Sequence, residues 1–295
     1  MVKMLNCTNI FVILGSPNNS DLNKQQILIW DDKNRKKIYK LLIKREILNL
    51  ELTPNKIVVV CENIIYIFNS QSFQLVDIIK TGQNPKGLIG ISYKESNIIV
   101  YPSVDSEHGK LTIKNYDSNN YIYLNPHDHS ITNIALSYNG VFLATVSQEG
   151  KKIRIFEAKT GRYLDELHRE ENDKIKSISI NKNNNFISVS CQKGVIPLWS
   201  LKKAKNIIRE EIEEFDKVTN IHGGFFVDKE RGFNHINLKE HKDLEFEAVK
   251  LGDQNFLYII TSNGLFFKIK FESEVKTKKV EGNFEILDLD NLFVE

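Results

Sequence analysis

Short runs of branched and aromatic residues recur along the chain, separated by turn-forming residues. The clearest runs cover residues 57–60, 64–68, 98–101 and 256–260. Branched and aromatic side chains suit a pleated, half-buried surface, and the Asn, Gly, Asp and Lys clusters between the runs suit hairpins. The pattern predicts an all-β protein.

Two of the predicted units superimpose with a period of 44 residues. This interval separates Phe142 from Phe186 and Gly150 from Gly194. A repeat of about 40–45 residues with four strands is typical of the blades of a β-propeller. The chain contains six such units, at residues 2–45, 46–81, 82–125, 126–168, 172–240 and 244–290. We therefore expect residues 1–295 to form a single WD40-like β-propeller domain of four-stranded blades.

Residues 204–218 have the periodicity of a helix instead. Ile208, Ile212 and Phe215 recur at intervals that place them on one helical face. The other face carries four glutamates: Glu210, Glu211, Glu213 and Glu214. Helices that lie on membranes are usually rich in Lys and Arg. We expect a charged excursion at about residues 202–230 that packs against the propeller; the alternatives are docking to a protein and insertion into a membrane.

Composition limits the kind of partner. The 40 Lys and Arg residues nearly balance the 38 Asp and Glu residues, so we expect no nucleic-acid binding, and an anionic ligand must be held by a local cluster. Cys7, Cys61 and Cys191 have no paired spacing, which argues against disulfides and zinc. The apolar run at residues 10–14 is too short for a signal peptide or a membrane span. We expect a cytoplasmic monomer.

Catalytic signatures are missing from the sequence. It has no Gly-rich phosphate loop, Gly-x-Ser-x-Gly elbow, His-Glu-x-x-His or Cys-x-x-Cys motif. The run His127-Asp128-His129 is the one pattern that suggests a metal, but alternate residues of a strand face opposite sides. We expect a binding platform rather than an enzyme, with no cofactor or metal.

Several segments match the landmarks of a known family in order and spacing. They lie at residues 27–32, 57–68, 84–88 and 131–156. In this arrangement the sequence resembles the PROPPIN family of phosphoinositide-binding WD-repeat β-propellers, most densely over residues 27–102 and 131–199. The resemblance implies seven blades, including an N-terminal blade that this chain lacks. Six readable units then imply six blades or a ring that closes in another way.

The family motif Phe/Leu-Arg-Arg-Gly reads Leu167-His168-Arg169-Glu170 in this chain. Members hold two phosphoinositide head groups on the two arginines, because guanidinium groups form charge-assisted, often bidentate hydrogen bonds to phosphate. Here a histidine replaces the first arginine. The resemblance assigns the first lipid site to His127, Thr145, Ser147, Arg154 and His168, and the second to Arg169 and Ser190.

The second pocket and its surroundings depart further from the family pattern. Cys191, Val195 and Pro197 stand where hydroxyls and a histidine are expected, and the segment from Asp165 to Lys174 holds five acidic residues against two basic ones. Nearby carboxylates offset much of what one arginine contributes. We expect weakened phosphoinositide recognition.

The resemblance implies a scaffold in autophagy or membrane trafficking that binds protein partners. Relatives dock such partners near the second and third blades, which assigns partner binding to Asn84 and Lys86. The alternative for this segment is a proline-fixed turn with a solvated lysine. For the whole chain, one alternative is a functional effector of phosphatidylinositol 3-phosphate or 3,5-bisphosphate with His168 protonated. Another is an unrelated WD-type adaptor.

Overall fold

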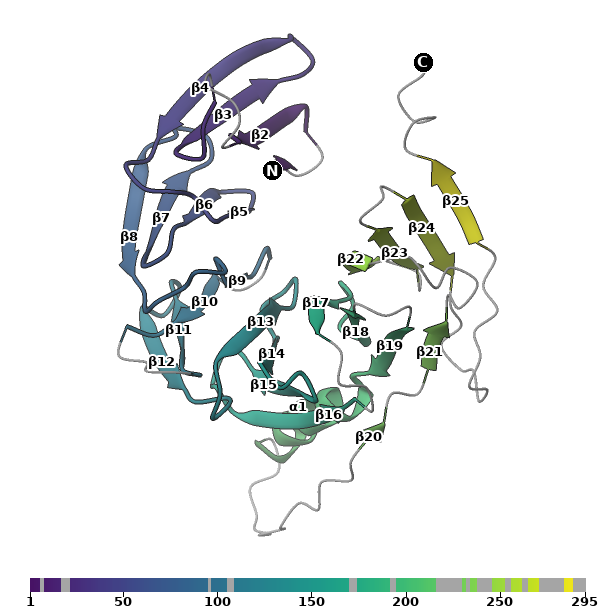
Figure 1. The fold of residues 1–295 in the computed structure, drawn as a ribbon. Coiled ribbons are helices and arrows are strands. Elements are labelled where there is room, and N and C mark those ends of the chain that lie inside the picture. Colours follow the sequence, from purple (N-terminus) through teal and green to yellow (C-terminus); the bar gives the residue numbers. More distant parts are fainter. Residues whose placement is uncertain are drawn as a thin grey trace. The chain divides into compact units, whose positions relative to one another are not determined.

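The computed structural model describes residues 1–5, 8–16, 22–94, 97–104, 109–169, 174–191, 195–215, 230–231, 234–237, 246–252, 256–261, 265–270 and 284–288. The chain divides into two units, Met1–Leu124 (unit 1) and Asn125–Glu295 (unit 2). Within the described residues each unit contains three β-sheets (Figure 1).

The three sheets of unit 1 each consist of four consecutive antiparallel strands. Sheet 1 comprises β1 (Val2–Met4), β2 (Ile10–Leu14), β3 (Gln26–Asp31) and β4 (Lys36–Leu42). Sheet 2 comprises β5 (Asn49–Leu52), β6 (Lys56–Val60), β7 (Ile64–Asn69) and β8 (Leu75–Lys80). Sheet 3 comprises β9 (Gly90–Ile91), β10 (Ile98–Pro102), β11 (Leu111–Asn115) and β12 (Asn120–Leu124).

The sheets of unit 2 include two connections between strands that are not consecutive. Sheet 4 comprises β13 (Ile131–Leu136), β14 (Phe142–Ser147), β15 (Lys152–Glu157), β16 (Tyr163–His168) and, as a fifth strand, β20 (Glu230–Arg231). Sheet 5 comprises β17 (Ile175–Ile180), β18 (Phe186–Cys191), β19 (Val195–Ser200) and β21 (Asn234–Asn237). Sheet 6 comprises β22 (Phe246–Leu251), β23 (Phe256–Thr261), β24 (Leu265–Lys270) and β25 (Phe284–Asp288).

Five of the six sheets fall within the units that the sequence predicts, and sheet 4 does so apart from β20, which comes from the unit at residues 172–240. The prediction of four-stranded blades is confirmed, with β20 as an additional strand of sheet 4. The 44-residue repeat also has a structural counterpart. Both β13 and β17 carry a bulge at the same place in the repeat, between Ile131 and Asn133 and between Ile175 and Ser177. Gly194, the second glycine of the repeat, lies outside the described residues. The assignment of residues 1–295 to a single domain stays a prediction.

The hydrophobic core lies between neighbouring sheets of the same unit. In unit 1, one apolar cluster joins sheets 1 and 2 and another joins sheets 2 and 3. In unit 2, one cluster joins sheets 4 and 5 and another joins sheets 5 and 6. Middle strands such as β14 and β18 are therefore buried along their whole length. Because both faces are buried, the polar residues of these strands are small ones, Thr145 and Ser147 in β14 and Ser188 and Ser190 in β18.

The predicted helix forms as α1 (Lys202–Phe215); residues 216–218 of the prediction lie outside the described part of the chain. Ala204 is buried, and Ile207 and Ile208 pack against the cluster between sheets 4 and 5. Lys203 Nζ also lies 3.4 Å from Asp165 Oδ1 on β16. α1 therefore packs against sheets 4 and 5, and Figure 1 shows it beside β16. The predicted excursion over residues 202–230 as a whole stays a prediction. No helix in the described ranges has the length and apolarity needed to cross a membrane.

Candidate functional site

One face of sheet 4 collects most of the residues assigned to the first lipid site. The register pairs Thr145 of β14 with Arg154 of β15, and Arg154 with Glu166 of β16. One row further along, Lys152 pairs with His168. Directly paired residues of neighbouring strands lie on the same face of a sheet. We call the surface formed by these five residues the sheet 4 face.

Glu166 is the centre of the sheet 4 face. Its two carboxylate oxygens lie 2.9 Å from Arg154 Nε, 3.0 Å from Lys152 Nζ and 3.1 Å from His168 Nε2. Burial opposes ionisation of Glu166, but hydrogen bonds from Arg154 and Lys152 outweigh it and hold the pKa of this carboxyl below its usual value. Part of the positive charge of the face is therefore neutralised from within the protein.

The basic side chains around Glu166 remain partly accessible to solvent. The side chains of Lys152, Arg154 and His168 are 44%, 27% and 22% exposed. Sequence reasoning did not assign Lys152 to this site, and it counted Glu166 only among the five acids of residues 165–174. The spacing contained the signal. Lys152 and Arg154 are two residues apart on one strand, and Glu166 and His168 are two residues apart on the next, so the members of each pair lie on the same face.

The neutral members of the first site are buried behind these cations. Thr145 and Ser147 are buried, and His127 Nε2 lies 3.0 Å from Thr145 Oγ1. Burial and the neighbouring Arg154 guanidinium lower the pKa of His127 to about 4, so this imidazole is uncharged at neutral pH. The residues assigned to the first site are thus brought together, while their role as lipid ligands stays a prediction.

The residues assigned to the second lipid site are enclosed. Arg169 is 9% exposed and donates hydrogen bonds to Gly150 O at 2.8 Å and Cys191 Sγ at 3.0 Å. Ser190 is 0% exposed, and its Oγ lies 2.8 Å from Ser177 Oγ. Both side chains therefore bond within the protein. The acids Glu170, Glu171 and Asp173 lie outside the described residues.

The backbone register of β19 and β21 pairs Pro197 with His235, so a histidine stands next to a position where the sequence analysis noted that one was missing. His129 does not join His127 but pairs with Glu149 at 3.0 Å. In the described part of the chain, no group of three or more His, Cys, Asp or Glu residues could hold a metal ion.

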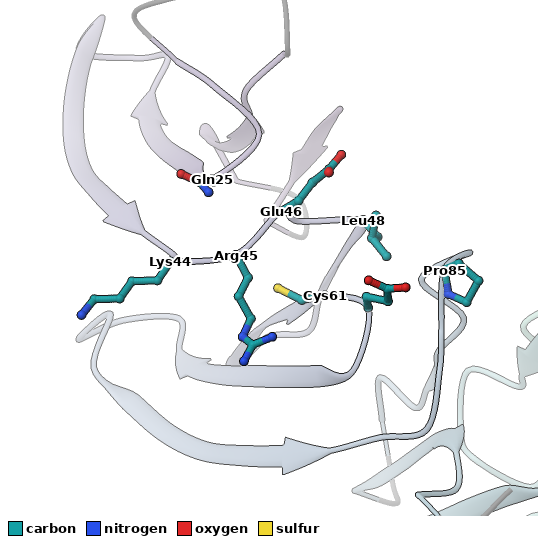
Figure 2. A pocket seen from close by; sticks show the side chains of 8 residues that line it. Gln25, Lys44, Arg45, Glu46, Leu48, Cys61 and Pro85 are labelled. Atoms are coloured by element: carbon teal, nitrogen blue, oxygen red, sulfur yellow. The ribbon is translucent and has the colours of Figure 1, made fainter.

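Unit 1 contains a cavity of about 470 Å3 between sheets 1 and 2. It is lined by the segment that connects β4 to β5 and by neighbouring turns, with the residues Gln25, Lys44, Arg45, Glu46, Leu48, Cys61, Glu62 and Pro85 (Figure 2). Burial raises the pKa of the Cys61 thiol to about 11, so it is protonated and unreactive at neutral pH. The cavity combines exposed cations with apolar surface.

The assigned partner-binding residues Asn84 and Lys86 lie on either side of Pro85 in the chain, at the edge of this cavity. Asn84 is buried, and its side chain donates to Leu88 O at 2.9 Å and accepts from Leu88 N at 2.7 Å. It shapes the turn, whereas Lys86 is exposed. Of the two, only Lys86 has a side chain placed to contact a partner directly.

The outer strand of sheet 1 lies next to the cavity and has a distinctive surface. β4 exposes the apolar side chains of Ile38, Tyr39 and Leu42 together with those of Lys36, Lys37 and Lys40. Among the described strands β4 pairs with β3 alone and forms one end of sheet 1. Residues 33–45 contain seven basic residues and no acid. The turn at residues 32–35 leads directly into this strand.

Comparison with known proteins places the chain among β-propellers. Its structure is similar to Kluyveromyces lactis Hsv2, with a TM-score of 0.72 and 19% identity over 96% of this chain and 84% of that chain. It is also similar to KlAtg21 in its complex with the coiled coil of AgAtg16, with a TM-score of 0.75 and 15% identity over 97% of this chain and 83% of that chain. At these identities the likeness shows the fold alone, and the predicted β-propeller fold class is confirmed.

Comparison of the sequence with known proteins identifies the family to which the chain belongs. The chain is 27% identical to autophagy-related protein 18e of Arabidopsis thaliana, over 92% of this chain and 72% of that protein. It is 31% identical to autophagy-related protein 18 of Dictyostelium discoideum over 53% of this chain, a match that spans 42% of the relative's length. The PROPPIN family model matches residues 5–251. The chain belongs to the PROPPIN family.

Proposed function

We propose that this chain is a scaffold in autophagy or membrane trafficking that binds an acidic protein partner through unit 1 and recognises phosphoinositides weakly through the sheet 4 face. The observation that carries the proposal is the contrast in available charge. The lysines of β4 are exposed on the end strand of sheet 1, whereas Lys152 and Arg154 of the sheet 4 face share the Glu166 carboxylate. Autophagy is the process named for the relatives in Arabidopsis and Dictyostelium.

The surface of unit 1 is suited to an extended acidic segment. A free strand edge offers backbone hydrogen bonds to an added strand, and side-chain pockets provide specificity. The lysines of β4 would repel a second copy of the same strand, because like charges directly opposite each other are unfavourable. The same lysines attract a segment rich in Asp and Glu. The cavity beside β4 can then accept an apolar side chain of that segment between Leu48 and Pro85.

Weak lipid recognition follows from the two assigned lipid sites. The remaining motif arginine, Arg169, already bonds to Gly150 and Cys191, and Arg154 is bonded to Glu166. A phosphate group must compete with these internal partners. The partly exposed side chains of Lys152 and Arg154 favour residual binding of a phosphate rather than complete loss. Tight, head-group-specific binding to vesicles would instead support the alternative, a full phosphoinositide effector.

The partner-binding proposal is tested with a labelled extended peptide rich in Asp and Glu, against the same peptide with Asn and Gln in place of the acids. We expect the purified chain to bind the acidic peptide, and Lys44→Glu together with Arg45→Glu to weaken binding at least tenfold, because both residues line the cavity. Lys159→Glu is the matched control, since Lys159 is equally exposed but lies in the turn between β15 and β16. Equal binding by all three proteins would contradict the assignment of this surface.

The lipid-binding proposal is tested by co-sedimentation with vesicles that contain phosphatidylinositol 3-phosphate, against vesicles without it. We expect weak but specific binding that Arg154→Gln reduces. Binding that is tight and survives Arg154→Gln would contradict both the weakness and the site. Absence of binding would remove the lipid part of the proposal and leave the scaffold role, which the partner experiment measures separately.

A further inference from the structure

The last strand of sheet 3, β12, exposes two tyrosines that the proposed function does not use (Figure 1). Tyr121 is 42% exposed and Tyr123 is 77% exposed, the highest value among the large hydrophobic side chains of the described residues. Most of a tyrosine ring is apolar, and adjacent exposed apolar side chains mark sites of interaction. We call the surface formed by these two rings the tyrosine surface.

The register places the tyrosine surface on the side of sheet 3 that faces sheet 2, within unit 1. Tyr121 pairs with Lys114 of β11, and Tyr123 pairs with Thr112. Lys114 Nζ lies 2.6 Å from Asp77 Oδ2 on β8, the last strand of sheet 2. Residues two apart on a strand project to the same side, so the two exposed rings stand next to each other above this ion pair.

The neighbouring strands hold the base of the tyrosine surface in place. Lys114 is buried, and its Nζ lies 4.4 Å from the centre of the Tyr116 ring and 5.4 Å from that of Tyr121. Tyr116 donates a hydrogen bond from its hydroxyl to Asp77 Oδ2 at 2.7 Å. A ring that is already held from below loses little conformational freedom when a ligand binds. The surface is therefore prepared for binding.

The charges beside the tyrosine surface are balanced within the protein. Lys114 pairs with Asp77, and the second lysine of the cluster, Lys56, donates to the side chain of Asn97, whose backbone N–H donates to Asp117. Two cations therefore face two carboxylates, and no net charge is offered to a ligand. The accessible polar groups of the surface are phenol hydroxyls, which donate hydrogen bonds. The complementary ligand is uncharged, apolar and rich in hydrogen-bond acceptors.

We propose that the tyrosine surface binds a proline-rich segment of a partner protein in the polyproline II conformation. Such a segment has unpaired carbonyl groups and no N–H at its prolines, so its polar groups are acceptors that match the tyrosine hydroxyls. Residues two apart on a strand are separated by about 6.5–7 Å. This is close to the sum of two van der Waals contacts of about 3.5 Å, so a pyrrolidine ring fits between the two tyrosine rings. Surfaces lined by aromatic side chains recognise this conformation because it is already formed in the free ligand.

The inference goes beyond the proposed function, because it concerns neither the cavity between sheets 1 and 2 nor the sheet 4 face. The alternative is that the two rings only shield the ion pair between Lys114 and Asp77 from water. Tyr121 serves that purpose through its contact with Lys114. Tyr123 shields little, because most of its side chain is exposed. A substitution at Tyr123 therefore separates the two explanations.

The test measures binding of the full chain to fluorescein-labelled decaproline by fluorescence anisotropy, with a labelled Gly-Ser decapeptide as the reference. We expect decaproline to bind and the reference peptide not to bind. Tyr123→Ala should weaken binding roughly tenfold or more, because it removes one wall of the site. Tyr123→Phe should weaken it about threefold, because it keeps the ring and loses one hydrogen bond. Tyr163→Ala is the matched control, since Tyr163 is also 42% exposed but lies on β16 of sheet 4; it should bind as the unmodified chain does.

Four outcomes overturn the proposal. The first is equal binding of decaproline and the Gly-Ser peptide, or binding of neither. The second is equal affinity of Tyr123→Ala and the unmodified chain for decaproline. The third is tighter binding of a decaglutamate peptide that Tyr123→Ala abolishes, which assigns the surface to an acidic segment. The fourth is self-association in sedimentation experiments that Tyr123→Ala abolishes, which assigns it to a second copy of this chain. An unchanged melting temperature of Tyr123→Ala, together with its weaker binding of decaproline, supports the site, because it excludes loss of folding as the cause.

Discussion

The two polar clusters of unit 2 use their charged groups in opposite ways. On the sheet 4 face, Lys152, Arg154 and His168 surround one carboxylate and remain partly exposed. Around Arg169 and Ser190, the polar groups are enclosed and bond to Gly150, Cys191 and Ser177. The enclosed cluster stabilises the fold, while the exposed cluster is able to exchange an internal partner for an external anion.

The comparison shows that agreement with a motif does not determine what a residue does. Arg169 is the residue that matches the family arginine, yet its guanidinium is held inside the protein. Lys152 matches no motif position, yet its ammonium group is among the most accessible cations of the site. A basic residue that the neighbouring strands enclose supports the fold, whereas one that they leave exposed is able to bind a ligand.

The largest effect is expected for Arg169→Ala. The substitution leaves the carbonyl of Gly150 without its charged donor in a buried place, which costs about 3 kcal/mol in the free energy of unfolding. Urea unfolding followed by circular dichroism measures this loss. Arg154→Ala should cost clearly less, because that guanidinium is partly exposed. Equal losses in the two variants would break the distinction between an enclosed and an exposed cluster.

Acid should destabilise the protein through His127. Its folded pKa of about 4 lies below the value of about 6.5 in the unfolded chain. The unfolded state therefore binds more protons between these values, and stability falls as the pH is lowered through this window, by on the order of 2 kcal/mol. The urea midpoint measured between pH 7 and pH 4.5 should fall more in the unmodified protein than in His127→Gln. Identical pH dependence would show that His127 is not held neutral behind the sheet 4 face.

Glu166→Gln should strengthen phosphate binding about tenfold, equivalent to about 1.4 kcal/mol. The substitution removes the carboxylate that Lys152, Arg154 and His168 share, so their charge becomes available to an external anion. Vesicle co-sedimentation across a lipid titration measures the change. Glu157→Gln is the matched control, since Glu157 pairs with Arg162 at the opposite end of the same strands. Unchanged or weaker binding by Glu166→Gln would contradict the competition between Glu166 and the ligand.

The smallest effect is expected for Ser190→Ala. Loss of its hydroxyl leaves Ser177 without a hydrogen-bond partner for its backbone N–H and costs about 1 kcal/mol. Binding to phosphoinositide vesicles should not change, because Ser190 is fully buried. Thermal unfolding and vesicle binding on the same preparation measure both quantities. A loss of vesicle binding without a loss of stability would support the assignment of Ser190 as a lipid ligand.

Local patterns in the sequence were sufficient for the blades and for α1. Alternation, turn residues and the 44-residue repeat are properties of neighbouring residues, so they predict strands and hairpins without knowledge of the fold. The helix likewise shows its amphipathic spacing directly. The pairing of β20 with β16 could not be predicted in this way. It joins two residues to a strand more than sixty positions earlier, and a segment of two residues has no periodicity.

The sequence by itself determined the family, the β-propeller class, the six units and the replacement of an arginine by His168. Each of these depends on residue identity and order alone. Only the tertiary structure decided that Arg169 is enclosed, that Glu166 neutralises the cations around it, and that β20 pairs with β16. Burial, charge pairing and non-local register arise when strands distant in the chain pack together, because the environment of a side chain is set by its neighbours in space.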